Sequence, residues 1–146
     1  MNKKFMKEAL TQARLAFKEN EVPVGAVIVK DGEIIATGRN MREKKQSAIS
    51  HAEIEAIDGA CKKLESWRLD DCELYVTLEP CPMCAGAILN ARIKKLVFGA
   101  YDFNAGSVDS VINVCDHPYY KKPEIYGGIM EDECNKLLKS FFEKLR

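Results

Sequence analysis

The order of helix-like and strand-like segments predicts a three-layer α/β/α domain with a mixed central sheet. Segments with helical spacing alternate with short β-branched runs in the order helix, hairpin, helix, strand, helix, strand, helix. The chain has 146 residues, of which 47% are hydrophobic, and this suits one compact domain over residues 1–146. The sequence contains neither an internal repeat nor a linker-like stretch that would divide this domain.

The first elements are an amphipathic helix and a hairpin. Residues 3–19 predict the helix, because their apolar side chains recur at intervals of three and four. The apolar, β-branched runs 24–29 and 33–36 flank Asp31-Gly32, which is a strong signal for a two-residue hairpin turn.

The middle of the chain predicts a helix, a strand, a second helix and a second strand. A polar, irregular stretch over 41–50 precedes a helix over 51–64, whose apolar residues fall on one face. Residues 73–78 form an apolar strand. The short apolar helix over 82–90 begins with proline, which suits the first helical position. Residues 95–99 are a further strand.

The last third of the chain predicts a loop and a closing helix. Residues 101–123 contain glycine, proline, aspartate and asparagine, which favour a long loop. Residues 131–144 again show helical spacing.

Charge and cysteine content narrow the class of protein. The formal net charge is zero, with 22 basic and 22 acidic residues, so any binding to nucleic acid must come from a local patch. The six cysteines do not resemble a disulfide framework. The N-terminus has no signal-peptide core, and no run approaches the ~20 apolar residues of a membrane span. We therefore expect a cytoplasmic protein that does not cross a membrane.

Two short motifs, H-x-E and P-C-x-x-C, predict a catalytic zinc site with one Zn²⁺ per chain. They supply His51, Cys81 and Cys84 as ligands and leave one coordination position for water, whereas structural sites usually have four protein ligands. Zinc lowers the pKa of that water, and Glu53 is placed to move its proton. The same pair of motifs marks the zinc nucleobase deaminases.

Each half of the pattern also has another interpretation. Ser50-x-x-Glu53 fits a helix capping box, in which Glu53 would only bond to the Ser50 amide. Cys81-x-x-Cys84 fits a redox pair or half of a structural zinc knuckle. A closed zinc site would need a fourth ligand, and none of the remaining candidates lies in a second C-x-x-C: Cys61, Cys72, Cys115, Cys134 and His117.

Segments along nearly the whole chain resemble the bacterial tRNA-specific adenosine deaminases of the cytidine deaminase-like superfamily. They are residues 21–27 (EVPVGAV), 38–40 (GRN), 51–54 (HAEI), 67–69 (WRL), 75–86 (YVTLEPCPMCAG), 91–93 (ARI) and 141–142 (FF). The resemblance implies a cytidine deaminase-like fold, a homodimer, and conversion of adenosine to inosine at the wobble position of an arginine tRNA anticodon. The substrate would be recognised through the anticodon stem-loop.

The resemblance also implies roles for individual residues. His51, Cys81 and Cys84 would bind zinc, and Glu53 would be the proton shuttle. Asn40 would contact the target base, and Asp102 would lie beside the RNA strand. We also expect substrate contacts from Phe142, in a segment that matches the family, and from Tyr120, Lys121 and Lys122, which stand where the family holds RNA.

The stretch Tyr120-Lys121-Lys122 departs from the family, which has Asn-His-Arg there to help hold RNA. Tyr119 and Tyr120 can stack on bases, and the two lysines can bind phosphates. The same residues also fit a solvated surface loop.

We expect hydrolytic deamination in which hydroxide attacks C6 of adenine. Glu53 would accept the water proton and deliver it to the ring nitrogen and the leaving ammonia. The main alternative is a deaminase of a free base or nucleoside, of guanine or cytosine type, because the zinc motif does not separate the two; Asn40 and the long match favour RNA. A non-catalytic RNA-binding or dimer-partner subunit is a third hypothesis, and Glu53 argues against it, since such a protein needs no proton shuttle.

Overall fold

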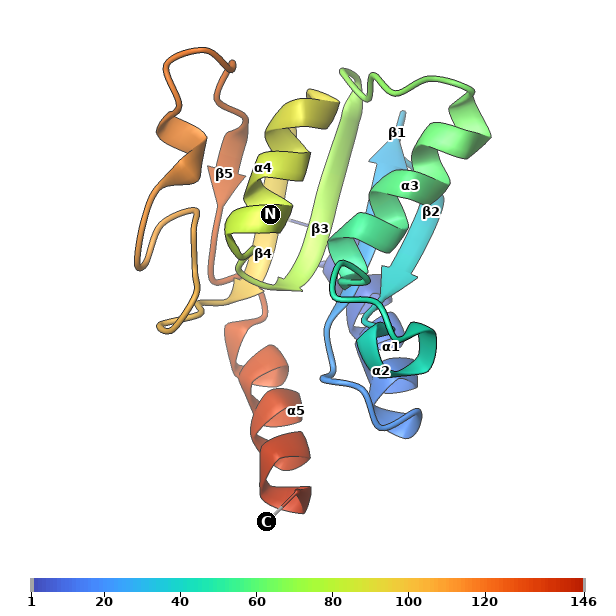
Figure 1. The fold of residues 1–146 in the computed structure, drawn as a ribbon, viewed down its shortest axis with the longest axis vertical. Coiled ribbons are helices and arrows are strands. Elements are labelled where there is room, and N and C mark those ends of the chain that lie inside the picture. Colours follow the sequence, from blue (N-terminus) through green and yellow to red (C-terminus); the bar gives the residue numbers. More distant parts are fainter. Residues whose placement is uncertain (1, 146) are drawn as a thin grey trace.

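The elements of the computed structural model, which describes residues 2–145, follow the order that the sequence predicts (Figure 1). The helices are α1 (Lys4–Lys18), α2 (Arg42–Lys45), α3 (Ala52–Leu64), α4 (Pro82–Ala91) and α5 (Glu131–Lys144), with a 3-10 turn η1 (Val114–Asp116). The strands are β1 (Gly25–Lys30), β2 (Glu33–Arg39), β3 (Cys72–Leu78), β4 (Lys95–Ala100) and β5 (Glu124–Tyr126). Within residues 2–145, no helix has the length and apolar character needed to span a membrane.

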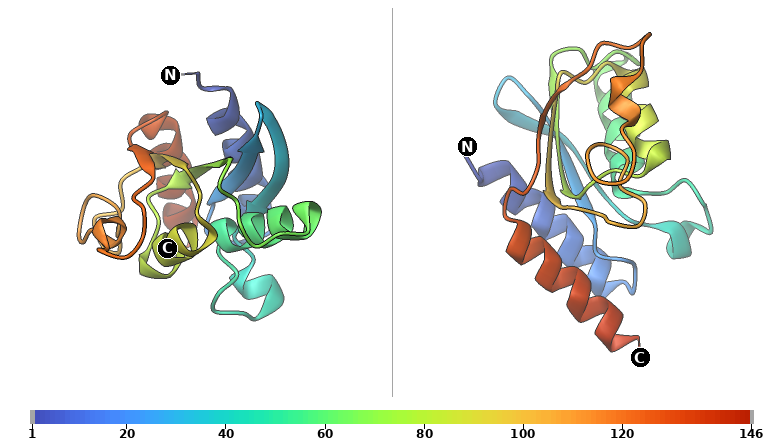
Figure 2. Two further views of the ribbon diagram at one scale, coloured as in Figure 1. Left: turned by 90° about the horizontal axis from the view of Figure 1, so that it is seen from above. Right: turned by 90° about the vertical axis from the view of Figure 1, so that its left-hand side faces the viewer.

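The strands form a single mixed sheet in the order β2-β1-β3-β4-β5. Strand β1 runs antiparallel to β2 and β3, whereas β3, β4 and β5 run parallel to one another. Helices α3 and α4 cover one face of the sheet, and α1 and α5 cover the other (Figure 2). This arrangement confirms the predicted three-layer α/β/α fold.

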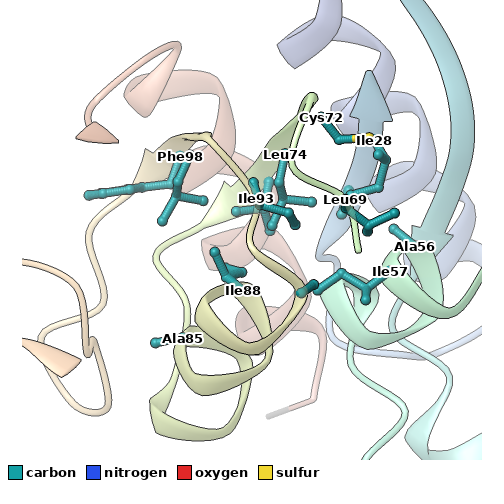
Figure 3. Close-up of a cluster of buried hydrophobic side chains, with 14 of the residues drawn as sticks. Ile28, Ala56, Ile57, Leu69, Cys72, Leu74, Ala85, Ile88, Ile93 and Phe98 are labelled. Carbon is teal, nitrogen blue, oxygen red and sulfur yellow. The ribbon is translucent and has the colours of Figure 1, made fainter. Parts of the chain in front are cut away.

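The two faces of the sheet carry separate hydrophobic cores, because successive side chains of a strand point to opposite faces. On β1, Ala26 and Ile28 pack with α3 and α4, while Val27 and Val29 pack with α1 and α5. Figure 3 shows the first core, in which the strand residues Leu74 and Phe98 lie beneath the helices. The helices that carry the H-x-E and P-C-x-x-C motifs are therefore fixed on the same face of one rigid sheet.

The predicted hairpin turn is present. Asp31 and Gly32 both have positive φ, 52° and 77°, as a type I′ turn requires.

Besides the 3-10 turn η1, which falls within the expected loop, two short elements depart from the sequence expectation. Helix α2 lies in the stretch expected to be irregular, and buried Glu21 stabilises it by accepting hydrogen bonds from the amides of Glu43 (3.1 Å) and Lys44 (2.7 Å). Strand β5 pairs with β4 over three residues just after the long loop. Both depend on contacts with distant segments, which local sequence patterns do not reveal.

Gly38 allows α3 to pack directly on β2. A Cβ atom at this position would overlap the carbonyl oxygen of Ala52 and the backbone nitrogen of Ala56, both on α3. The position of the first turn of α3 therefore depends on glycine at residue 38.

Replacing Gly38 by alanine should lower the free energy of unfolding by about 1 to 3 kcal/mol, because the added methyl group overpacks a rigid contact. Gly59→Ala is the matched control in the same α3–β2 layer: its Cβ would meet only the Ala36 Cβ, at an ordinary 3.5 Å. Since alanine favours helix by up to about 1 kcal/mol over glycine, this control should be neutral or stabilising. Urea denaturation measures both, and a Gly38→Ala variant as stable as the parent would disprove the close contact.

Candidate metal centre

The three predicted metal ligands lie at the N-terminal ends of two helices. His51 is the N-cap of α3 and Cys81 is the N-cap of α4. Pro82 occupies the start of α4, as the sequence predicts, and Cys84 lies in its first turn. The Nδ1 atom of His51 lies 3.6 Å from the Sγ atom of Cys81 and 3.5 Å from that of Cys84.

These distances fit a zinc ion. A tetrahedral zinc bound at about 2.0 Å by nitrogen and about 2.3 Å by sulfur holds such atoms about 3.5 Å apart. Across residues 2–145, the only cluster of three or more potential metal-ligating side chains is His51, Cys81 and Cys84. The candidates for a fourth ligand are outside this cluster: Cys61, Cys72, Cys115, Cys134 and His117. The geometry is that of an open, three-ligand site.

The two thiols have opposite pKa shifts. The Cys81 sulfur accepts hydrogen bonds from Cys84 and His51, which lower the pKa of Cys81 to about 4, although burial acts in the other direction. The same Cys81 contact, together with burial, raises the pKa of Cys84. Zinc ligation requires both groups as thiolates, so binding of the metal would displace the Cys84 proton.

Glu53 is a buried carboxyl group in the first turn of α3, with 4% of its surface exposed. Burial raises its pKa to about 7, despite opposing effects from its own backbone amide and from His51. A group that titrates near neutral pH can both accept and release a proton. The capping-box interpretation is wrong, because no side chain caps α3 and the Ser50 amide donates instead to the Ser47 carbonyl at 3.3 Å.

A pocket of about 190 Å³ opens beside this centre. It is lined by Val22, Val24, Asn40, Arg42, His51, Ala52, Glu53, Leu78, Glu79, Cys81, Asp102 and Ala105. The structure thus brings two of the expected substrate contacts, Asn40 and Asp102, together with Glu53 and two metal ligands. Arg42, Glu79 and Ala105 were not singled out from the sequence; only Glu79 carried a signal, as part of a segment of the family resemblance.

Asn40 and Asp102 are held in place by backbone contacts. The Asn40 side chain donates to the Val22 carbonyl at 3.4 Å and accepts from the Arg42 amide at 3.2 Å. The Asp102 carboxylate accepts from the amides of Asn104 (3.0 Å) and Ala105 (3.1 Å). Both side chains therefore form part of the pocket wall in fixed orientations.

The other expected substrate contacts do not line this pocket. Tyr119, Lys121 and Lys122 line a second cavity, of about 880 Å³, with residues at the N-terminal ends of β3, β4 and β5. Arg92 lies 4.9 Å from the centre of the Tyr120 ring. Phe142, on α5, is 47% exposed and packs edge-on against Phe141. Contacts of these residues with an RNA substrate remain a prediction.

The chain is similar to known deaminases over its full length. A protein-family model described as MafB19-like deaminase matches residues 1–146. The tRNA-specific adenosine deaminase of Bacillus subtilis (strain 168) is 48% identical over 143 residues, which cover 97% of this chain and 89% of that protein.

Solved structures give the same result. One from a study of A-to-I editing by tRNA:A34 deaminases at the wobble position of transfer RNA is 42% identical, with a TM-score of 0.90, and the match covers 93% of this chain and 99% of the other. The solved structure of a guanine deaminase from Bacillus subtilis is 38% identical, with a TM-score of 0.68, and the match covers 83% of this chain and 85% of the other.

Purified protein should contain one zinc ion per chain, and His51→Ala, Cys81→Ser or Cys84→Ser should each remove most of it, because two remaining ligands hold zinc weakly. Cys115→Ser is the matched control, since Cys115 is a buried free cysteine outside the cluster. Elemental analysis measures the metal content. Loss of zinc from the Cys115 variant would contradict the assignment, as would spectroscopic evidence of a fourth protein ligand.

Proposed function

This chain belongs to the family of tRNA-specific adenosine deaminases, and from that premise we propose that it converts adenosine to inosine at the wobble position of a tRNA anticodon. The observation that carries the proposal is the pocket, where an open three-ligand metal centre meets the buried carboxyl group of Glu53. The similarity to tRNA-specific relatives over nearly the whole chain supports the choice of substrate.

The chain's own residues divide the chemistry between them. His51, Cys81 and Cys84 would hold zinc, which when bound acts as a Lewis acid that makes water nucleophilic near neutral pH. Glu53 would accept one proton of the attacking water and deliver it to the ring nitrogen, and it would then move the second water proton to the amino group, which leaves as ammonia. The water oxygen would bond to C6 of adenine, and the bond from C6 to the exocyclic amino nitrogen would then break, which leaves inosine.

The pocket wall would bind the target base after it leaves the anticodon stack. Val22, Val24 and Leu78 offer apolar surfaces to the ring faces, and Asn40 and Asp102 offer polar groups for its edge. Because an anticodon loop is single-stranded, its bases can be turned outward at little cost.

The comparisons favour RNA over a free base as substrate. The tRNA-specific adenosine deaminase of Bacillus subtilis is 48% identical over 97% of this chain, whereas the guanine deaminase of the same organism is 38% identical over 83%. The position of Glu53 in the wall of the pocket argues against a non-catalytic subunit, because its buried carboxyl group lacks the set of amide donors that stabilises the equally buried Glu79.

The second cavity offers a basic surface for the rest of the RNA. Six cationic side chains line it, against three acidic ones: Arg68, Arg92, Lys94, Lys95, Lys121 and Lys122 against Asp70, Glu73 and Glu124. This local excess stands out on a chain whose formal net charge is zero. Tyr119, which is 74% exposed, supplies a face for stacking.

We also propose that the protein acts as a homodimer in the cytoplasm. Exposed apolar side chains, among them Trp67, Val111 and Ile112, support the assembly, because a partner would cover them. The proposed tRNA substrate supports the cytoplasmic location, because the enzyme must act where tRNA is present.

Glu53→Gln should retain zinc and stability within about 1 kcal/mol of the parent, yet lose ~10² to 10⁴-fold in the rate of inosine formation, because the amide cannot shuttle a proton. Glu55→Gln is the matched control: Glu55 lies in the same first turn but pairs at the surface with Lys45, at 2.7 Å. Single-turnover deamination of tRNA measures both variants. Activity of Glu53→Gln within tenfold of the parent would remove Glu53 from the mechanism.

Replacing both Lys121 and Lys122 by alanine should weaken tRNA binding and reduce the slope of log affinity against log salt by about 2, because two phosphate contacts are lost. Zinc content should not change. The control Lys4→Ala/Lys7→Ala removes the same charge from α1, on the other face of the sheet. The measurement is tRNA binding at several salt concentrations. A double variant that binds like the parent at each of them would show that Lys121 and Lys122 do not contact the RNA.

A further inference from the structure

Glu79 is a buried carboxylate that receives an unusual number of hydrogen bonds. It follows the end of β3 and is 1% exposed. Its Oε1 atom accepts from the Asp102 amide (3.1 Å) and the Ser110 hydroxyl (2.6 Å). Its Oε2 atom accepts from the amides of Val108 (3.2 Å), Asp109 (2.8 Å) and Ser110 (3.0 Å). All five donors belong to one segment, residues 102–110.

The segment is wound around this carboxylate. The Ser110 Oγ atom also lies 2.8 Å from the Asp102 carbonyl oxygen, so its single proton is shared between that oxygen and Glu79, and the Gly106 amide donates to the same carbonyl at 2.9 Å. At Gly106 a Cβ atom would overlap the Ser110 hydroxyl, the Asp102 carbonyl and Glu79 Oε1. The backbone between β4 and η1 contains no helix or strand, so these contacts replace secondary structure.

The same segment forms a wall of the pocket. Asp102 and Ala105 line it, and the Asp102 carboxylate is fixed in turn by the Asn104 and Ala105 amides. The position of the Glu79 carboxylate therefore sets where Asp102 meets a bound molecule. Four of the five donors are backbone amides, which do not depend on the residue type. The arrangement therefore depends mainly on the carboxylate at residue 79.

We propose that Glu79 is a positioning residue for substrate, which acts by fixing residues 102–110 as one wall of the pocket. It holds no reacting atom itself and works through Asp102 and Ala105. For the identity of its substrate, this inference rests on the proposed function.

The test is Glu79→Gln in the zinc-loaded, full-length protein. Glutamine has a single oxygen, so its NH₂ group must face backbone N–H donors and the segment must shift. We expect KM for an anticodon stem-loop RNA to rise about tenfold with kcat within about threefold, since the wall is displaced while the proton-transfer group remains. Zinc content should be unchanged, and the amides of residues 102 and 108–110 should exchange faster with solvent.

Two further variants separate positioning from general stability. Ser110→Ala removes one donor and leaves the carboxylate, so it should raise KM in the same direction by a smaller factor; it also decides the question if Glu79→Gln does not fold. Val29→Ala destabilises the core on the other face of the sheet and should leave KM unchanged.

The outcomes are distinguishable. A parent-like KM and parent-like exchange in both Glu79→Gln and Ser110→Ala would overturn the inference, and so would an equal rise of KM in Val29→Ala. A parent that does not deaminate RNA would overturn the proposed function instead, and the exchange measurement would still decide whether Glu79 orders the segment.

Discussion

The site depends on the meeting of two helix N-termini, those of α3 and α4, beyond the C-terminal end of β3. It places His51 Nδ1 within 3.5 to 3.6 Å of two sulfur atoms that lie 30 and 33 residues further along the chain. Parallel β3 and β4 set the position of α4, and the absence of a side chain at Gly38 lets α3 approach β2. A helix N-terminus also favours thiolate over thiol, so the position of Cys81 at the N-cap of α4 favours the thiolate that a metal needs, whereas Cys84 would lose its proton on binding.

Three buried glutamates in or near the pocket have different roles, because their carboxyl groups have different hydrogen-bond donors around them. Glu79 accepts five hydrogen bonds, which outweigh burial and lower its pKa. Glu21 accepts the first amides of α2 and so holds the segment that brings Arg42 to the pocket. Glu53 is equally buried but has no comparable set of donors, and its pKa rises to about 7. Two carboxylates thus shape the walls, and the third is left free to exchange a proton.

Local patterns in the sequence predict most of the fold and the centre of the site. The helical spacing over 131–144 and the Asp31-Gly32 turn appear in the structure as expected, because both depend on neighbouring residues. The ligand triad was predictable from motif spacing. Helix α2 was not, since it depends on Glu21, which lies 22 residues before Glu43. The separation of Lys121 and Lys122 from the zinc pocket also depends on tertiary structure: the long loop returns to the opposite end of the strands before β5 begins.

The proposed activity of this pocket is the deamination of an adenosine within tRNA. The most direct measurement supplies the zinc-loaded protein with an arginine tRNA that has adenosine at the wobble position and, separately, with free guanine and cytosine. Ammonia release is followed in each case, and the tRNA is sequenced for inosine. We expect one ammonia per tRNA, with inosine only at the wobble position, and no release from the free bases. Ammonia from guanine or cytosine, with the tRNA unchanged, would contradict the proposed activity.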